Sequence, residues 1–194
     1  MKFGRLLPAV LLGAVSAAAW GQIGVYLNPI ATRASNAQPD NGSFAFLGAG
    51  NTAATRGGVS LGGYYMFAHG KRLNLGVDAR DEWQGGNDSL LNSFLVGVRA
   101  SGTVGERLHP YVQVSGGAGT TRAPLTVVRT TKAMAKGYVG LDYNINRHLD
   151  FRVIEIGYGE LTTTSDALYN STLNYSADRL LSFSSGLVVR FGKK

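Results

Sequence analysis

Three histidines, His69, His109 and His148, are the side chains of this sequence best suited to acid–base chemistry, and the absence of cysteine excludes a thiol nucleophile. In enzymes that hydrolyse or transfer acyl chains, a histidine activates a serine hydroxyl by removing its proton. Each of these histidines falls in a short connection between two segments of alternating polarity, and none stands beside a serine in a long connection. The acidic residues also lack a paired spacing specific for catalysis. The sequence therefore predicts a protein that is not an enzyme and that holds no metal or cofactor.

One glycine-rich stretch superficially matches a nucleotide-binding motif. The spacing Gly48-Ala-Gly50-Asn-Thr-Ala53 is similar to the turn of dinucleotide-binding proteins. In that motif a helix follows directly and turns its N-terminus toward the pyrophosphate. Here Gly57 and Gly58 lead into a strand-like segment instead, so we expect no nucleotide site.

Charged residues stand at alternate positions of several segments, which would place them together on one face. The clearest case is 73–82, where Asp78 and Arg80 alternate with Val77 and Ala79. Alternation with a period of two is typical of a strand with one apolar and one polar face. The residues expected on the polar faces are Asp78, Arg80, Glu82, Arg99, Lys136, Asp142, Arg152, Glu155 and Arg190.

Eight segments with this alternation provide the elements that would position these charges. The last, Leu181–Phe191, is long and apolar on one face, and in an open sheet it would leave an unpaired edge that invites aggregation. The seventh segment breaks phase, so a β-bulge near Val153 is needed to keep Arg152 and Glu155 on the same face. The predicted strands are 23–32, with Pro29 toward its far end, 58–67, 73–82, 91–101, 110–119, 133–145, 149–159 and 181–191.

The connections between these segments favour closure into a membrane barrel. Apart from the N-terminus, no apolar run approaches the roughly 20 residues that a membrane helix needs. Connections predicted as long (33–57, 83–90, 120–132 and 160–178) alternate with short ones (68–72, 102–109 and 146–148). Outer-membrane barrels have long extracellular loops and short periplasmic turns, and an even strand number leaves both termini in the periplasm. The sequence therefore predicts an all-β fold, an eight-stranded antiparallel up-and-down transmembrane β-barrel.

Inside such a barrel the charged face would point into the lumen. Eight strands enclose just enough space for side chains to fill, and opposite charges there are expected to pair. The alternative is that the charges form a path for protons or ions. Tyr26, Tyr64 and Tyr138 are also expected to point inward, where they could stack on a ligand. The outward aromatic residues expected to form the two interfacial girdles are Tyr65, Phe67, Phe94, Tyr143, Phe151, Phe183 and Phe191.

The C-terminal strand carries a family resemblance. With Phe183, Leu187 and Val189 alternating up to a terminal Arg-Phe191, it resembles the last strand of small bacterial outer-membrane β-barrels of the OmpA/OmpX type. In that family the last strand ends in an aromatic residue and is read by the barrel-assembly machinery; here Gly192, Lys193 and Lys194 follow it. The resemblance implies a fold, a location in the cell outer membrane among lipid and lipopolysaccharide, and the assembly machinery as a partner.

The N-terminus has the features of a cleavable signal peptide. Lys2 and Arg5 precede an apolar stretch and a run of small residues. Cleavage after Ala19 or after Gly21 fits the pattern, and the latter divides the chain into a leader, 1–21, and a barrel domain, 22–194. The net charge of +7 could suggest nucleic acid as a partner. Because the basic residues are scattered and no basic helix is present, nucleic-acid binding is not expected.

For function, the sequence favours a structural or surface-interaction role through the loops 33–57 and 160–178, with an unknown extracellular ligand. Phe44, Phe46 and Leu47 are expected to fold back over the barrel mouth or to form a contact surface. The alternatives are a narrow pore for small solutes and a lipid-modifying barrel enzyme.

Overall fold

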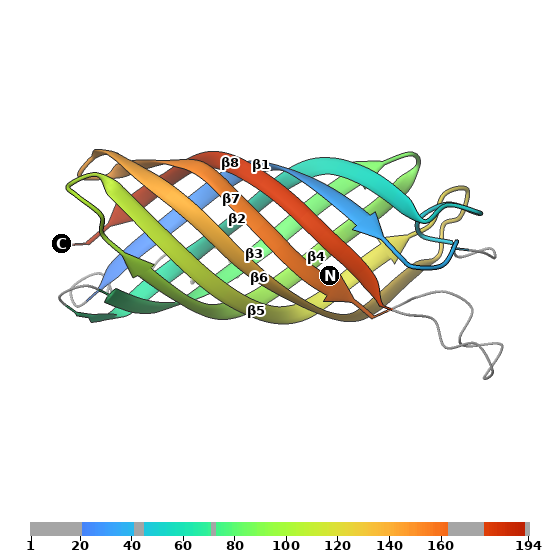
Figure 1. Cartoon of the computed structure of the whole chain (residues 1–194), viewed down its shortest axis with the longest axis horizontal. Coiled ribbons are helices and arrows are strands. Elements are labelled where there is room, and N and C mark those ends of the chain that lie inside the picture. Colours follow the sequence, from blue (N-terminus) through green and yellow to red (C-terminus); the bar gives the residue numbers. More distant parts are fainter. Residues whose placement is uncertain (1–20, 41–44, 71–72, 163–176, 193–194) are drawn as a thin grey trace, which may run out of the picture.

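Eight antiparallel strands close into a single barrel. The computed structural model describes residues 21–40, 45–70, 73–162 and 177–192. Each strand pairs with the next along the chain, and the last pairs with the first (Figure 1). This confirms the predicted all-β, up-and-down barrel fold. The strands are β1 (Gln22–Ser35), β2 (Ala53–His69), β3 (Leu73–Gly86), β4 (Ser89–Gly102), β5 (Leu108–Arg122), β6 (Arg129–Asn146), β7 (Leu149–Leu161) and β8 (Asp178–Phe191).

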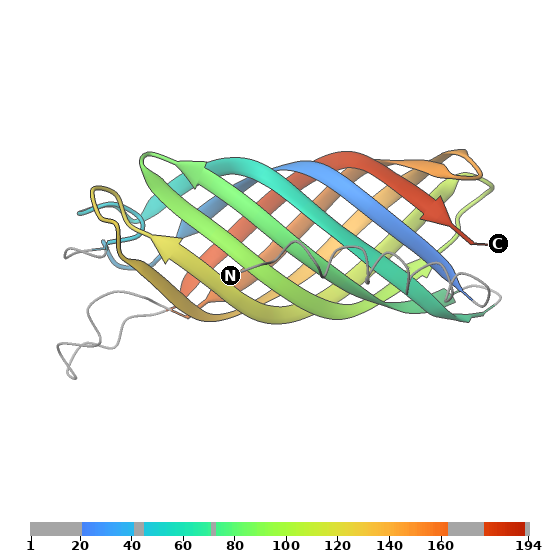
Figure 2. The same ribbon diagram turned by 180° about the vertical axis from the view of Figure 1, so that it is seen from behind.

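The two ends of the barrel differ in the chain segments that they carry. The start of β1 and the end of β8 lie at one end, which we call the terminal end, together with the turns after β2, β4 and β6 (Figures 1 and 2). The connections after β1, β3 and β5 lie at the other end, which we call the mouth. Residues 1–20, most of the predicted leader, are outside the described residues. No helix in the described ranges is long and apolar enough to cross a membrane.

The outward side chains form a largely apolar surface, in which Asp81 of β3 is an exception. Val77, Val98 and Leu187, for example, are 44%, 59% and 50% exposed, and each is followed in its strand by a buried residue. Because no residue that the structure describes covers these side chains, hydrocarbon is the environment that would solvate them. The predicted outward aromatic residues lie toward both ends: Tyr65 and Phe191 both pair with Ile23 near the terminal end, whereas Phe183 pairs with Ala31 nearer the mouth.

The strands extend beyond the predicted bounds, and one predicted long loop does not exist. The range 83–90 is a tight hairpin in which Gly86 pairs with Ser89 across the turn residues Asn87 and Asp88. Both turn residues have positive φ, 49° and 57°, and such a two-residue turn matches the twist of the paired strands. The prediction was wrong because the polar and glycine-rich composition of this range suggested a loop, while asparagine and aspartate tolerate the left-handed conformation that lets pairing continue.

Two irregularities lie in the wall formed by β7, β8 and β1. The structure has a bulge between Arg152 and Glu155, so that Val153 and Ile154 both point outward and the two charges both point inward. Pro29 lies in the middle of β1, contrary to its predicted place near the strand end. It pairs with Val59 of β2, while the ladder between β1 and β8 is interrupted beside it. Proline fits there because it has no N–H group to donate to a ladder.

Inward glycines make room for the tyrosine rings of the lumen. Tyr26 is paired with Gly62, and Tyr64 with Gly24. A Cβ atom at either glycine would overlap the ring of its partner. The same relation holds between Tyr111 and Gly140. In this narrow barrel each of these three rings thus occupies space left by a glycine on a neighbouring strand.

Candidate functional site

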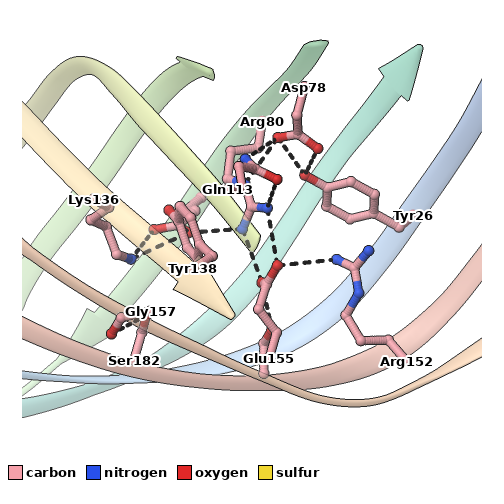
Figure 3. Close-up of polar contacts among 12 residues, drawn as sticks. Tyr26, Asp78, Arg80, Gln113, Lys136, Tyr138, Arg152, Glu155, Gly157 and Ser182 are labelled. Atoms are coloured by element: carbon pink, nitrogen blue, oxygen red, sulfur yellow. Dashed lines mark hydrogen bonds and ion pairs between the residues drawn. The ribbon is translucent and has the colours of Figure 1, made fainter. Parts of the chain in front are cut away.

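Arg80 lies at the centre of the lumen and contacts carboxylates on two strands. It is 1% exposed. Its Nη1 and Nη2 atoms donate to the two carboxylate oxygens of Glu155 at 2.9 and 3.0 Å, and its Nε lies 3.2 Å from Asp78 Oδ1 (Figure 3). Two parallel bonds between a guanidinium and a carboxylate are among the strongest ionic contacts in proteins. Arg80 therefore ties β3 to β7 across the lumen.

The two carboxylates that hold Arg80 have further donors. Glu155 accepts hydrogen bonds from the Tyr111 hydroxyl at 2.7 Å and from Ser184 Oγ at 3.0 Å. Asp78 accepts one from the Tyr26 hydroxyl at 3.0 Å and one from Gln113 Nε2 at 2.7 Å (Figure 3). The neutral donors occupy carboxylate lone pairs that the cations leave free, which is the condition for a tolerable buried charge.

A second group lies on the mouth side of Arg80. Lys136 Nζ lies 3.0 Å from Glu82 Oε2, and the Tyr138 hydroxyl donates to Glu82 Oε1 at 3.1 Å. The Tyr138 ring centre is 3.8 Å from the guanidinium carbon of Arg80. The ring thus connects the two groups through a cation–π contact.

A third group lies toward the terminal end, where two arginines share one carboxylate. Arg99 Nη2 is 2.8 Å from Asp142 Oδ2, and Arg152 Nε is 2.9 Å from Asp142 Oδ1. Arg152 Nη1 also reaches Glu155 Oε2 at 3.4 Å. This contact depends on the bulge in β7, which turns both side chains inward.

Together these groups fill the middle of the lumen with balanced charge. We call them the central charge network: the cations are Arg80, Arg99, Lys136 and Arg152, and the anions are Asp78, Glu82, Asp142 and Glu155. Each carboxylate has at least one cation within 3.2 Å. Arg190, also predicted to point inward, pairs outside this network with Asp150 at 2.8 Å.

The mouth is closed by an apolar plug from the connection between β1 and β2. Ala45, Phe46 and Leu47 are 3%, 1% and 3% exposed. The turn is held by Asp40, whose Oδ2 accepts the Leu47 backbone N–H at 2.9 Å. The predicted folding back thus has Phe46 and Leu47 inside the barrel, while Phe44 lies outside the described residues. The plug packs in one cluster with Ala34, Leu91, Leu95, Met134, Tyr138, Leu161 and Leu180.

Arg56 of β2 contacts the plug. Its guanidinium carbon is 3.7 Å from the Phe46 ring centre, its Nη2 donates to the Phe46 carbonyl at 2.6 Å, and its Nε donates to Ser89 Oγ at 2.8 Å. Arg56 and Asp178 lie outside the apolar outward band, which begins at Val59 on β2 and Leu181 on β8. Burial lowers the pKa of Arg56 to about 10. Burial, assisted by Asp40, raises the pKa of Asp178 to about 6.

The histidines lie near the terminal end. His69 ends β2, His109 is the second residue of β5 and His148 is in the turn after β6. The His109 Nδ1 atom is 3.3 Å from Thr103 Oγ1, and the His148 Nδ1 atom is 3.3 Å from the Arg190 carbonyl. Within the described ranges, no group of three or more histidine, aspartate or glutamate side chains could hold a metal ion.

Several residues of the lumen were not among the predicted inward positions. Tyr111 and Asp150 share the alternation of inward neighbours on β5 and β7, so the pattern could have identified both. Arg56 stood in a range predicted as loop, and no signal placed it inside. The residues predicted as an assembly signal, Phe183, Leu187, Val189 and Phe191, all point outward from β8.

No family model matches the sequence, and no curated protein matches it significantly. The solved structures give a different result. The Neisserial surface protein A matches with a TM-score of 0.59 over 87% of this chain and 97% of its own, at 13% identity. The fold is that of the small outer-membrane β-barrels.

Two further solved structures share this barrel fold. The attachment invasion locus protein Ail of Yersinia pestis, in complex with the heparin analogue sucrose octasulfate, matches with a TM-score of 0.55 over 88% of this chain and 99% of its own, at 13% identity. The outer membrane protein OprG of Pseudomonas aeruginosa gives a TM-score of 0.50 over 90% of this chain and 98% of its own, also at 13% identity. This small outer-membrane barrel therefore retains the fold with a largely different sequence.

Proposed function

We propose that this protein is a non-enzymatic barrel of the outer membrane, with both termini in the periplasm and a closed lumen, that acts at the cell surface through the connections at its mouth. The observation that carries the proposal is the double obstruction of the lumen. The central charge network fills its middle, and the plug of Phe46 and Leu47 fills its mouth. In a barrel closed in this way, the connection after β1 and the predicted loop 160–178 are the surfaces left for interaction at the mouth.

Outward-facing arginines at the mouth support lipopolysaccharide as a surrounding partner. Arg33 on β1 and Arg179 on β8 are exposed and point outward, and they are diagonal neighbours because Arg33 pairs with Leu181 and Ser35 with Arg179. Arg179 also pairs in register with Glu160. Guanidinium groups at this height would meet the phosphate groups of the outer leaflet. The apolar outward face of β8 is, in the same proposal, the surface that the assembly machinery reads.

A lipid-modifying activity receives no support from the placement of the histidines. A histidine that activates a serine would have to lie where the acyl ester of the lipid arrives, which in this orientation is the mouth rim. His69, His109 and His148 lie near the terminal end. The names of the neighbours are consistent with a surface role, since one is called a surface protein and another an attachment invasion locus protein.

The orientation can be tested with single cysteines, because the chain has none of its own. Asp88→Cys, in the β3–β4 turn at the mouth, is expected to react with a membrane-impermeant maleimide on intact cells. Arg147→Cys, in the β6–β7 turn at the terminal end, is expected to react only after the outer membrane is permeabilised. Both sites are exposed turn residues, so each is the matched control for the other. The reverse labelling pattern would refute the proposed orientation, and labelling of neither in the membrane fraction would refute surface display.

Because the lumen is closed, we expect the protein not to conduct ions. The purified protein in a planar bilayer is expected to show no steady conductance at neutral pH, because the paired charges and the apolar plug leave no continuous aqueous path. Phe46→Ala removes the plug ring but leaves the central charge network, so it too is expected to remain closed. Stable open channels in the unmutated protein would favour the narrow pore instead.

A further inference from the structure

One lipid-facing position of the barrel wall carries a carboxylate. Asp81 is the ninth residue of β3, and it points outward because Arg80 and Glu82 on either side of it are buried in the lumen. Its direct neighbours across the strands are Leu61 of β2 and Phe94 of β4. Both neighbours are exposed on the outer surface, at 42% and 56%. The half-buried carboxylate of Asp81 therefore lies within the apolar surface.

Asp81 has no cation as a partner in the part of the chain that the structure describes. The ion pairs of these residues all involve other carboxylates. The donor that acts on Asp81 is the backbone N–H group of Glu82. An ionised carboxylate in hydrocarbon is costly, and ionisable residues inside a membrane are usually paired and functional. We therefore looked for a cation from outside the chain that suits this position.

The depth of Asp81 makes the headgroup of an ordinary lipid an unsuitable partner. β3 runs toward the mouth, and Trp83 is the next outward residue in that direction. Exposed tryptophan is typical of the level of the lipid headgroups. Asp81 thus lies on the hydrocarbon side of that level. In phosphatidylethanolamine the ammonium group is attached beyond the phosphate, so it remains at the level of Trp83 or farther out.

A second copy of this chain also lacks a suitable cation. On the described strands, the arginines that point outward all lie within two residues of a strand end at the mouth; they are Arg33, Arg122, Arg129 and Arg179. The lysines of these strands, Lys132 and Lys136, lie on the inward face of β6. The apolar surface of a second copy therefore offers no lysine or arginine at the depth of Asp81.

The surface beside Asp81 suits an apolar chain. Ala79 is the next outward residue of β3 toward the terminal end, and it pairs directly with Gly63 of β2. Because Gly63 has no side chain and Ala79 has a single methyl group, the surface is lower there than at Leu61 and Phe94. An apolar chain that lies over this pair has its end nearer the mouth at Asp81.

We propose that Asp81 is the anionic end of a binding site for lipophilic amines, molecules in which a protonated amino group is attached directly to an apolar chain. The ammonium group pairs with Asp81, and the chain lies over Gly63 and Ala79 toward the terminal end. An ammonium group carries the opposite charge and three hydrogen-bond donors, while a carboxylate only accepts. The site is separate from the surface role proposed above, since it lies on the lipid-facing wall and not at the mouth.

The test uses dodecylammonium as the probe. Folded protein labelled with ¹⁵N is placed in nanodiscs of phosphatidylcholine, and the backbone amide signals of Ala79 and Asp81 are followed by NMR while dodecylammonium is added at neutral pH. Dodecanol, which has the same chain and no charge, is the matched control. Saturable shifts are expected with dodecylammonium, whereas dodecanol is expected to give only small shifts in proportion to the amount added. Nanodiscs that contain phosphatidylethanolamine are expected to give no such shifts without the probe.

Variants separate binding at Asp81 from general partition into the bilayer. Asp81→Asn keeps the shape and removes the charge, so it is expected to weaken binding about tenfold, as the loss of a charge-assisted bond implies. Asp81→Glu is expected to retain binding. Asp88→Asn removes a carboxylate from the exposed β3–β4 turn and is expected to change nothing. Ala79→Leu raises the surface under the chain and is expected to weaken binding, whereas Ala135→Leu, the same change at an outward position of β6, is not.

Three results would overturn the proposal. One is the absence of a saturable shift with dodecylammonium, or an equal response to dodecanol. Another is unchanged affinity in Asp81→Asn. The third is a response to phosphatidylethanolamine as large as the response to dodecylammonium, because it would assign Asp81 to a lipid headgroup.

Discussion

Replacement of Arg80 by alanine is expected to reduce the free energy of unfolding by about 3–5 kcal/mol, the usual cost of breaking a buried ion pair. Arg80 is fully buried and holds both Asp78 and Glu155. Its removal leaves two buried carboxylates short of a cation. The measurement is urea unfolding in lipid vesicles, followed by tryptophan fluorescence and by the faster migration of the folded barrel on unboiled gels.

Two companion variants make this prediction specific. Arg122→Ala breaks an exposed ion pair, 3.5 Å from Asp88, and is expected to cost less than about 1 kcal/mol. The double variant Arg80→Met with Glu155→Gln removes one charge of each sign and is expected to recover part of the lost stability. Equal effects of Arg80→Ala and Arg122→Ala would show that the lumen is wet enough to screen its charges.

The second large effect is expected on the outer surface. Val77→Arg places a charge on an outward position at the fifth residue of β3, and such a charge is expected to cost about 2–4 kcal/mol at the bilayer midplane. Leu73→Arg places the same charge at the start of the same strand, where the cost falls to about 0–1 kcal/mol. Both parent residues are exposed on the apolar surface, at 44% and 52%. The difference between the variants therefore reports depth in the membrane.

A size control completes this experiment. Val77→Ala removes apolar surface without adding charge and is expected to have a much smaller effect than Val77→Arg. The quantities compared are the free energies of unfolding in vesicles and the yields in the outer-membrane fraction. If the alanine and arginine variants behave alike, Val77 does not face lipid.

The fold was predictable because strand alternation in a narrow barrel is strict. An inward position lies in a crowded lumen and an outward position lies in hydrocarbon. The type of almost every residue in a strand therefore indicates which way its side chain points. The phase break after Arg152 was readable as a bulge for the same reason. The hairpin at Asn87 and Asp88 could not be predicted in this way. Beyond the apolar band, neither face of a strand must be apolar or polar, and the composition of this range is that of a loop.

For the charged residues of the lumen, the sequence predicted only the strand face on which each one lies. Alternation places Arg80 and Glu155 in the lumen but says nothing of their mutual height, which follows from the register of β3 through β7 and from the bulge. The folding back of Phe46 was one of two alternatives that the sequence left open, whereas the contact of Arg56 with its ring was not expected. An arginine in a glycine-rich range carries no sequence signal for the ring that it will contact.

The pairing of β1 with β8 has a consequence for the order of folding. All other strand pairs join neighbours along the chain, so successive hairpins can form locally, whereas this pair joins residues such as Ile23 and Phe191. Contacts between distant parts of a chain form late, because the loop-closure entropy must be overcome first. Until that seam closes, Arg80 on β3 has no fixed place beside Glu155 on β7, and Tyr26 on β1 has none beside Arg152 on β7. We therefore expect closure of the barrel to complete the contacts of the central charge network that cross the lumen.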